Sequence, residues 1–483
     1  MKTSSVALPV ALAGLFSAAG CVHEMSAGRT EPGVAPGPGL PWTPPASVET
    51  TPAPAPAPSQ IPPDLLKTAQ GWGLNDLIDL ALRNNPDTRA AWFAARSAAA
   101  DLGAQRGAYY PTTFAQEATT RQKGSAVGGQ FTFHSTTTNP SIVMNYLLLD
   151  FGGRKAAVEE SRQALIAANW SHNAAIQDAV LGVQQAYYQY LNTRALEVAE
   201  QAALKEAHAN LDAADHRHEA GLSTVADVLQ ARTALSQARL RLETAQGQIQ
   251  VIRGVLATAV GLPANTSFDV EIPLQEVPLA QGTEQVDRLI EQAQARRPDL
   301  SAARALVLKA QANLDNARAQ DRPTLTTTLN GGRIFYAPDY NSQDTYSLGF
   351  MLTVPIFNGL TYHYNVFKAE ADTEVSRARL DSLQQQATFQ VWNSYYNQKT
   401  ATQRVLTTRD LLESASQSYD VVSARYKAGV GSILDLLSAE SALASARAQE
   451  AQARTDWFVA TAQLAHDTGG LWGPPGPGQK ETP

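Results

Sequence analysis

The polar residues that could do chemistry in this chain of 483 residues occur as a repeated pair. Thr224 precedes Asp227 by three positions, and Ser432 precedes Asp435 by the same spacing. At the start of a helix, a hydroxyl and an acid so spaced satisfy free amides of the first turn, and the acid lies at the positive end of the helix dipole. The pattern therefore predicts two helix starts, each carrying a carboxylate.

One stretch is rich in histidine. His208, Asp212 and His216 recur every four residues, which places them on one face of a helix where they could offer metal ligands. We prefer the interpretation that this is a solvated helix end with intrahelical ion pairs. The chain also lacks a glycine-rich phosphate loop, a nucleophile motif and a strong metal-spacing cluster, so we expect no cofactor, no metal site and no enzymatic activity.

The elements that position these residues are written twice. Segments starting at Gln185 and Asn393 keep identical spacing over 55 residues, with an offset of 208. An upstream pair of prolines is separated by 25 residues in both copies. Two copies of one unit, roughly 74–262 and 286–470, therefore make up nearly the whole protein. The matched positions include Gly221 with Gly429, Asp227 with Asp435, Pro86 with Pro298, and Pro111 with Pro323.

Each copy contains a very long segment with few helix breakers, Arg154 to Ala220 and Leu360 to Ala428. A continuous helix of that length would extend about 100 Å. Gly221 and Gly429 end these segments and a second helix begins at once, so each pair forms a helical hairpin. Short helices at 87–108 and 299–319, together with return helices of about 40 residues, would match one long helix if stacked end to end.

The first return helix shows a heptad seam in which large and small residues alternate, and this allows close packing of a neighbouring helix. A dimeric coiled coil is the alternative interpretation. The seam consists of Val228, Leu235, Leu242, Ile249 and Leu256, with Ala231, Ala238, Ala245, Ile252 and Ala259.

Each copy also offers two segments with strand character before its long helix. Tyr346, Leu348 and Phe350 alternate with polar or small residues, and Ile142, Met144 and Tyr146 hold matching positions in the first copy. Their partners are Thr112 to Gln122 and Thr324 to Ile334. We expect hairpins with about ten residues per strand, the length that spans a bilayer when tilted. Four strands cannot close in lipid, because the smallest barrels need about eight, so the barrel must be shared between chains. A small soluble sheet is the alternative.

The N-terminus has the pattern of an export signal over residues 1–20, followed by the single cysteine, Cys21. The placement is similar to a bacterial lipoprotein signal, whose cysteine becomes the lipidated first residue, and Val22 then favours outer-membrane sorting. An ordinary signal with an incidental cysteine is the alternative. Residues 21–70 are expected to form a proline-rich tether and 471–483 an unstructured tail. The net charge of −7 gives no indication of nucleic-acid binding, and no helical membrane span is expected.

The chain resembles the TolC-type outer-membrane factor family in four features: the proline-delimited helix, the strand pair, the F-x-G turn at Phe151 and Phe357, and the A-G-x-x-[ST] hairpin. Its N-terminus resembles the OprM-type lipoprotein branch of that family. The resemblance implies a homotrimer of mainly α fold. Duplicated helical hairpins would form a periplasmic α-barrel, and four strands per protomer would contribute to a shared 12-stranded outer-membrane β-barrel. Residues 71–262 and 286–470 would be the two repeats, and 263–285 an equatorial linker.

The resemblance also implies a gate at the periplasmic mouth. Asp435 matches an aspartate that lines the closed entrance, Tyr426 a gate tyrosine, and Asp227 an acid that links neighbouring hairpins. The family's basic partner falls at Gly431 and its second acidic ring at Ser438, so we infer a looser or differently latched closure. Three copies of a carboxylate around one axis would gain proton affinity and favour cations.

What the resemblance implies about function is the outer-membrane exit duct of a tripartite efflux system. The hairpin tips at Gly221 and Gly429 would dock to a periplasmic adaptor of an inner-membrane transporter, most simply of RND type, and the barrel would contact outer-membrane lipid. A duct for type I protein secretion is the nearest alternative. A periplasmic coiled-coil scaffold without a pore is an alternative of another class.

Overall fold

The computed structural model describes residues 71–471 apart from 127, 129, 267, 269, 272–276, 279–284 and 338–340. The predicted signal peptide, Cys21, the tether and all but the first residue of the tail lie outside the described residues, as does part of the predicted equatorial linker. The expectations for these segments stay predictions.

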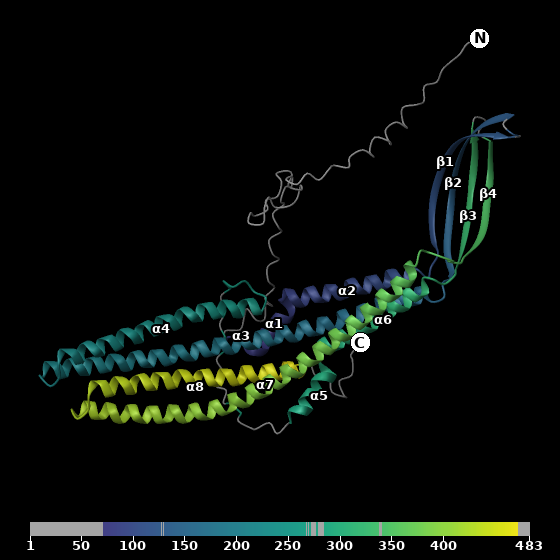
Figure 1. Ribbon diagram of the computed structural model, residues 1–483. Coiled ribbons are helices and arrows are strands. Elements are labelled where there is room, and N and C mark those ends of the chain that lie inside the picture. Colours follow the sequence, from purple (N-terminus) through teal and green to yellow (C-terminus); the bar gives the residue numbers. More distant parts are fainter. Residues whose placement is uncertain are drawn as a thin grey trace, which may run out of the picture. The chain divides into compact units, whose positions relative to one another are not determined.

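Two long helices and two return helices form the hairpins that the sequence predicts (Figure 1). The long helices are α3, Gly153–Glu219, and α7, Thr361–Lys427, and each has 67 residues. The return helices are α4, Val225–Ala259, and α8, Ile433–Asp467, and each has 35 residues rather than about 40. They are shorter because α4 is followed by Gly261 and α8 by Gly469, both with left-handed backbone that ends the helix.

The short helices also form, and each is preceded by a further helix that the sequence analysis missed. The predicted helices are α2, Pro86–Gly107, and α6, Pro298–Ala319, and each starts at its proline. The missed helices are α1, Leu74–Asn84, and α5, Val286–Arg296, of 11 residues each. In α1, Leu77, Leu80 and Ala81 are buried, so a narrow apolar face was the available signal.

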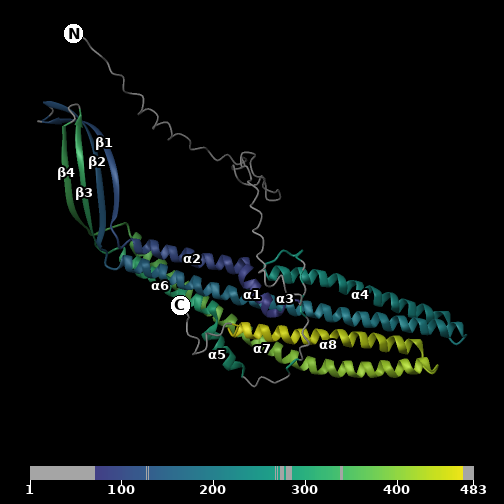
Figure 2. The same cartoon turned by 180° about the vertical axis from the view of Figure 1, so that it is seen from behind.

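The short and return helices stack end to end along the long helices, as expected (Figure 2). Both α2 and α4 pack on α3, and both α6 and α8 pack on α7. A Cβ added to Gly261 would lie 2.8 Å from the carbonyl carbon and oxygen of Asn84, where α1 ends. A Cβ added to Gly469 would lie 3.0 Å from the carbonyl carbon of Arg296, where α5 ends. The duplicated glycines therefore let two helix ends meet without an intervening side chain.

The heptad seam of α4 is filled by α3 of the same chain. Val228 and Ala231 are buried in one cluster with Ala214 of α3, while Ile249 and Leu256 share a cluster with α3 residues further from the tip. A dimeric coiled coil built on this seam is thus the wrong interpretation, because its partner is already present. Among the described helices, none combines the length and the apolar character that a membrane-crossing helix requires.

The four strands form one antiparallel sheet in the order β1-β2-β3-β4. The strands are longer than predicted, 13 to 19 residues rather than about ten, because backbone pairing continues past the apolar segments into polar ones. Pairing of β2 with β3 joins the two copies, and within the described residues β1 and β4 each pair on one side only. Their bounds are Thr112–Ala126, Phe131–Leu149, Thr324–Ala337 and Asn341–Thr353.

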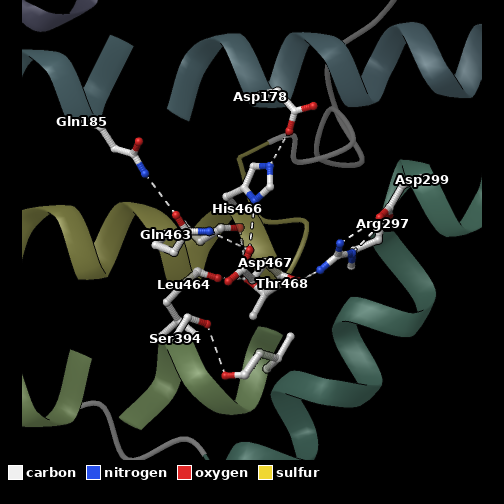
Figure 3. A network of polar contacts seen from close by, with 12 residues as sticks. Asp178, Gln185, Arg297, Asp299, Ser394, Gln463, Leu464, His466, Asp467 and Thr468 are labelled. Carbon is white, nitrogen blue, oxygen red and sulfur yellow. Dashed lines mark hydrogen bonds and ion pairs between the residues drawn. The ribbon is translucent and has the colours of Figure 1, made fainter. Parts of the chain in front are cut away.

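A polar network joins the end of α8 to α3 (Figure 3). Nε2 of His466 lies 2.9 Å from a carboxylate oxygen of Asp178 on α3, and its Nδ1 lies 3.0 Å from Oδ1 of Asp467. Arg297, at the start of α6, donates to the Asp467 carbonyl at 3.3 Å and forms an ion pair with Asp299. Burial by itself would lower the pKa of His466, but its hydrogen bonds with Asp178 and Asp467 outweigh burial and raise the pKa to about 9.

Candidate functional site at the hairpin tips

The predicted polar pairs start the two return helices. At α4, Thr224 Oγ1 accepts the Asp227 amide at 3.4 Å, and Asp227 Oδ2 accepts the Thr224 amide at 3.0 Å. At α8, Ser432 Oγ accepts the Asp435 amide at 3.1 Å. The Asp435 carboxylate is exposed, and it forms no hydrogen bond or ion pair within the described part of the chain. The predicted helix starts are confirmed. The two acids differ because only the Asp227 side chain accepts a hydrogen bond from the backbone amide of its N-cap residue, which completes a capping box.

Tyr426 is buried where the two hairpins meet. Only 3% of its surface is exposed, and it packs with Val228 of α4 and with Ile433 and Leu436 of α8. Burial raises the pKa of the Tyr426 hydroxyl, and the Asp227 charge raises it further while Arg217 opposes the change. The hydroxyl has no hydrogen-bond partner among the described residues, so the structure brings Tyr426 near Asp227 without joining them.

A basic residue that the sequence analysis missed does join the two tips. Arg217, in the last turn of α3, donates from Nη1 to the carbonyl of Tyr426 at 2.6 Å. Its guanidinium carbon lies 4.8 Å from the centre of the Tyr426 ring, which is the geometry of a cation–π contact. Gly431, where a basic partner was expected, packs tightly instead, since an added Cβ would lie 3.0 Å from the Tyr426 amide nitrogen. The signal that could have revealed Arg217 is its equivalence to Arg425 in the second copy.

The two turns are exposed and carry apolar side chains. Gly221 and Gly429 have left-handed φ values of 72° and 83°, and both are exposed. Large hydrophobic side chains surround them with more than half of their surface in solvent, which marks a candidate contact surface. They are Leu222, Val225, Val430 and Leu434.

The histidine-rich stretch lies on the exposed face of α3. His208, Asp212 and His216 are all exposed, and His216 forms a 3.8 Å ion pair with Glu219 on the same helix. Among the residues that the structure describes, no group of three histidine, cysteine or acidic side chains could hold a metal ion. The geometry accordingly favours the solvated helix end with its intrahelical pair.

The two copies coincide with a known family. A sequence profile described as "Outer membrane efflux protein" matches residues 77–262 and 289–470. The chain belongs to this family. Outer membrane efflux proteins are channel proteins of the outer membrane, so the predicted TolC-type recognition and outer-membrane location are confirmed.

Individual relatives extend over most of this outer membrane efflux protein. The chain is 29% identical to Protein CyaE of Bordetella pertussis, over 77% of this chain and 79% of the relative. It is 26% identical to the probable efflux pump outer membrane protein TtgC of Pseudomonas putida, over 89% and 90%. The crystal structure of the outer membrane protein VceC from Vibrio cholerae matches with a TM-score of 0.73 at 22% identity, over 82% of this chain and 96% of VceC. The predicted fold class is confirmed by this likeness of fold.

Proposed function

We propose that this protein is the outer-membrane exit duct of a tripartite efflux system, which passes small molecules from a periplasmic adaptor and an inner-membrane transporter out of the cell. The observation that carries the proposal is the family match over both copies. TtgC, similar over nearly the full length of both chains, is named as an efflux pump component. The duct acts as a passive conduit and not as an enzyme.

The working form is a homotrimer. The described part of one chain supplies four strands, and within it β1 and β4 each pair on one side only. A lipid-facing sheet cannot keep open edges, and the smallest closed barrels need about eight strands. If β4 of each chain pairs with β1 of the next, three chains with four strands each supply a closed barrel of twelve strands. The long helices would continue the same closed arrangement into the periplasm.

The hairpin tips at Gly221 and Gly429 dock to the adaptor. Exposed apolar side chains at both tips support this assignment, because such side chains gain free energy when a partner covers them. The inner-membrane partner is proposed to be of RND type. The barrel itself would contact outer-membrane lipid. Lipidation at Cys21 would in addition anchor the N-terminus at the membrane.

Tyr426, Asp435 and Asp227 form the periplasmic gate in this proposal. The exposed, unpaired Asp435 carboxylate is free to face a shared axis, where three copies would repel one another and attract cations. Tyr426 would fill the space between the tips, and Asp227 would hold the start of α4 beside it. The gated duct should therefore prefer cations.

Single-channel conductance in a planar bilayer tests the duct and its gate together. We expect a small conductance from the wild type and a larger one from the Tyr426→Ala, Asp435→Ala double variant. Asp381→Ala, which removes an exposed acid from α7 46 residues before the end of that helix, should leave the conductance unchanged. If none of the three proteins conducts although each forms a folded trimer, the proposal of a pore would be overturned and a scaffold would be favoured. An unchanged double variant would remove only the gate assignment, and a reversal potential that indicates anion preference would contradict the acidic ring.

A further inference from the structure

Two arginines occupy equivalent positions in the two copies, but only one has a partner. Arg217 lies in the last turn of α3, and Arg425 lies in the last turn of α7, 208 residues further along. Arg217 donates to the carbonyl of Tyr426 and lies over its ring. The Arg425 side chain is exposed, and within the described ranges it forms no hydrogen bond or ion pair. One of two equivalent donors is therefore unused in a single chain.

The acceptors correspond as well, because His218 holds the position in the first copy that Tyr426 holds in the second. The Tyr426 carbonyl accepts the amide of Gly429 at 3.0 Å, and the His218 carbonyl accepts the amide of Gly221 at 2.9 Å. A carbonyl oxygen has two lone pairs, and on Tyr426 the second one takes Arg217. The His218 carbonyl receives no such guanidinium from any described residue.

The order of the helices explains why one arginine is left over. Toward the tips, α4 packs on α3, α3 on α8, and α8 on α7. The α3 tip therefore has the hairpin of the second copy beside it, whereas no hairpin of the same chain lies beyond α7 among the described elements. A second chain placed there, with its β1 beside β4 of the first, would set its α4 against α7, as α8 lies against α3 within one chain. The end of its α3 would then lie as near to Arg425 as the end of α7 lies to Arg217. A head-to-tail contact of this kind closes into a ring when the rotation is right.

We propose that Arg425 clamps the tip of α7 to the main-chain carbonyl and ring of His218 of the partner subunit, as Arg217 clamps α3 to Tyr426 within one subunit. The proposal rests on the trimer of the proposed function and adds two positioning residues to its gate. Two clamps in each of three subunits join all the tips into one closed ring. Because both acceptors are main-chain carbonyls, this closure needs neither the Tyr426 hydroxyl nor a basic residue at Gly431.

Conductance measurements test the two clamps separately. Each variant removes three clamps from the trimer, one for each subunit. Arg217→Gln and Arg425→Gln should therefore each raise the ratio of open to closed channels by at least about tenfold, because the loss of a single charge-assisted hydrogen bond already shifts a two-state equilibrium by about that factor. Lys427→Gln is the matched control, because it removes an exposed positive charge two residues from Arg425 and should leave the open probability unchanged. An Arg425→Gln variant that behaves as the control would overturn the clamp between subunits, and the same result for Arg217→Gln would overturn the clamp within one.

Cross-linking gives a second measurement that does not depend on the pore. With a short dimaleimide, an Arg425→Cys, His218→Cys variant should yield covalent dimers and trimers in a denaturing gel. Arg217→Cys combined with Tyr426→Cys should react within one chain and stay monomeric, and Arg425→Cys alone controls for Cys21. Only monomers from the first variant, in a preparation that is trimeric by native mass, would overturn the proposal. A wild type that is not trimeric would overturn the proposed function as well, so the two failures are distinguishable.

Discussion

Replacing His466 by glutamine should lower the free energy of unfolding at neutral pH but not at alkaline pH. His466 lies between Asp178 and Asp467, and 17% of its side chain is exposed. Its pKa is raised from 6.5 to about 9, so the folded protein binds the imidazole proton more tightly than the unfolded chain does. The stabilisation is therefore fully present below pH 6.5 and is lost as the pH rises through 9.

The raised pKa sets the magnitude. A shift from 6.5 to about 9 corresponds to about 3 kcal/mol in the free energy of unfolding at pH 6, about 1.4 kcal/mol at pH 8 and almost nothing at pH 10. Because about 400 ordered residues give an unfolding entropy of about 0.8 kcal/mol/K, 3 kcal/mol corresponds to about 4 °C in the melting midpoint. Asp178 is largely exposed, so solvent screening makes these values upper estimates.

Thermal melting of wild type and His466→Gln at pH 6, 8 and 10 measures the effect. The difference between the two melting midpoints should shrink steadily as the pH rises. Tyrosines and lysines titrate in both proteins, so their effect on the midpoint cancels in this difference. His208→Gln, an exposed histidine on α3, is the control and should show no difference at any pH. A His466→Gln difference that stays constant from pH 6 to pH 10 would show that the imidazole charge does not hold α8 to α3.

Three further changes test the packing. Gly261→Ala should lower the unfolding free energy by about 1–3 kcal/mol, because its φ is 82° and an added Cβ would lie only 2.8 Å from the Asn84 carbonyl. Gly247→Ala, at a position on α4 where an added Cβ meets open space, should instead raise the unfolding free energy by about 0.5–1 kcal/mol. Equal effects of the two variants in denaturant melts would contradict this. Ala238→Leu should cost about 1–3 kcal/mol in the same assay because the fully buried site has no room, and a neutral result would mean that the seam is loose. Burial is the largest effect that raises the pKa of Glu440, so the charged form of this side chain destabilises the fold. Glu440→Gln should therefore have a higher melting midpoint than the wild type at neutral pH, and this difference should disappear on acidification. A lower midpoint would instead show that the charge is stabilising.

The sequence predicted the elements well where the signal was local. Pro86, Gly221 and Ser432 mark helix boundaries through their own backbone or side-chain chemistry, and the helices begin or end beside them. The short helices α1 and α5 were missed, because an 11-residue helix has too few turns for its apolar face to stand out. Strand lengths were underestimated because the ladder continues through polar residues, which carry no alternation of hydrophobicity.

By itself the sequence determined the duplication, the two hairpins, the helix caps and the heptad seam, since each depends on residues close together in the chain. Only the tertiary structure decided which distant groups meet. Arg217 and the Tyr426 carbonyl are 209 positions apart, and His466 and Asp178 are 288 apart. No spacing rule relates such residues, because their contact depends on how α3, α7 and α8 lie against one another. The side chains that hold the tips and the end of α8 in place were therefore visible only once the helices had packed.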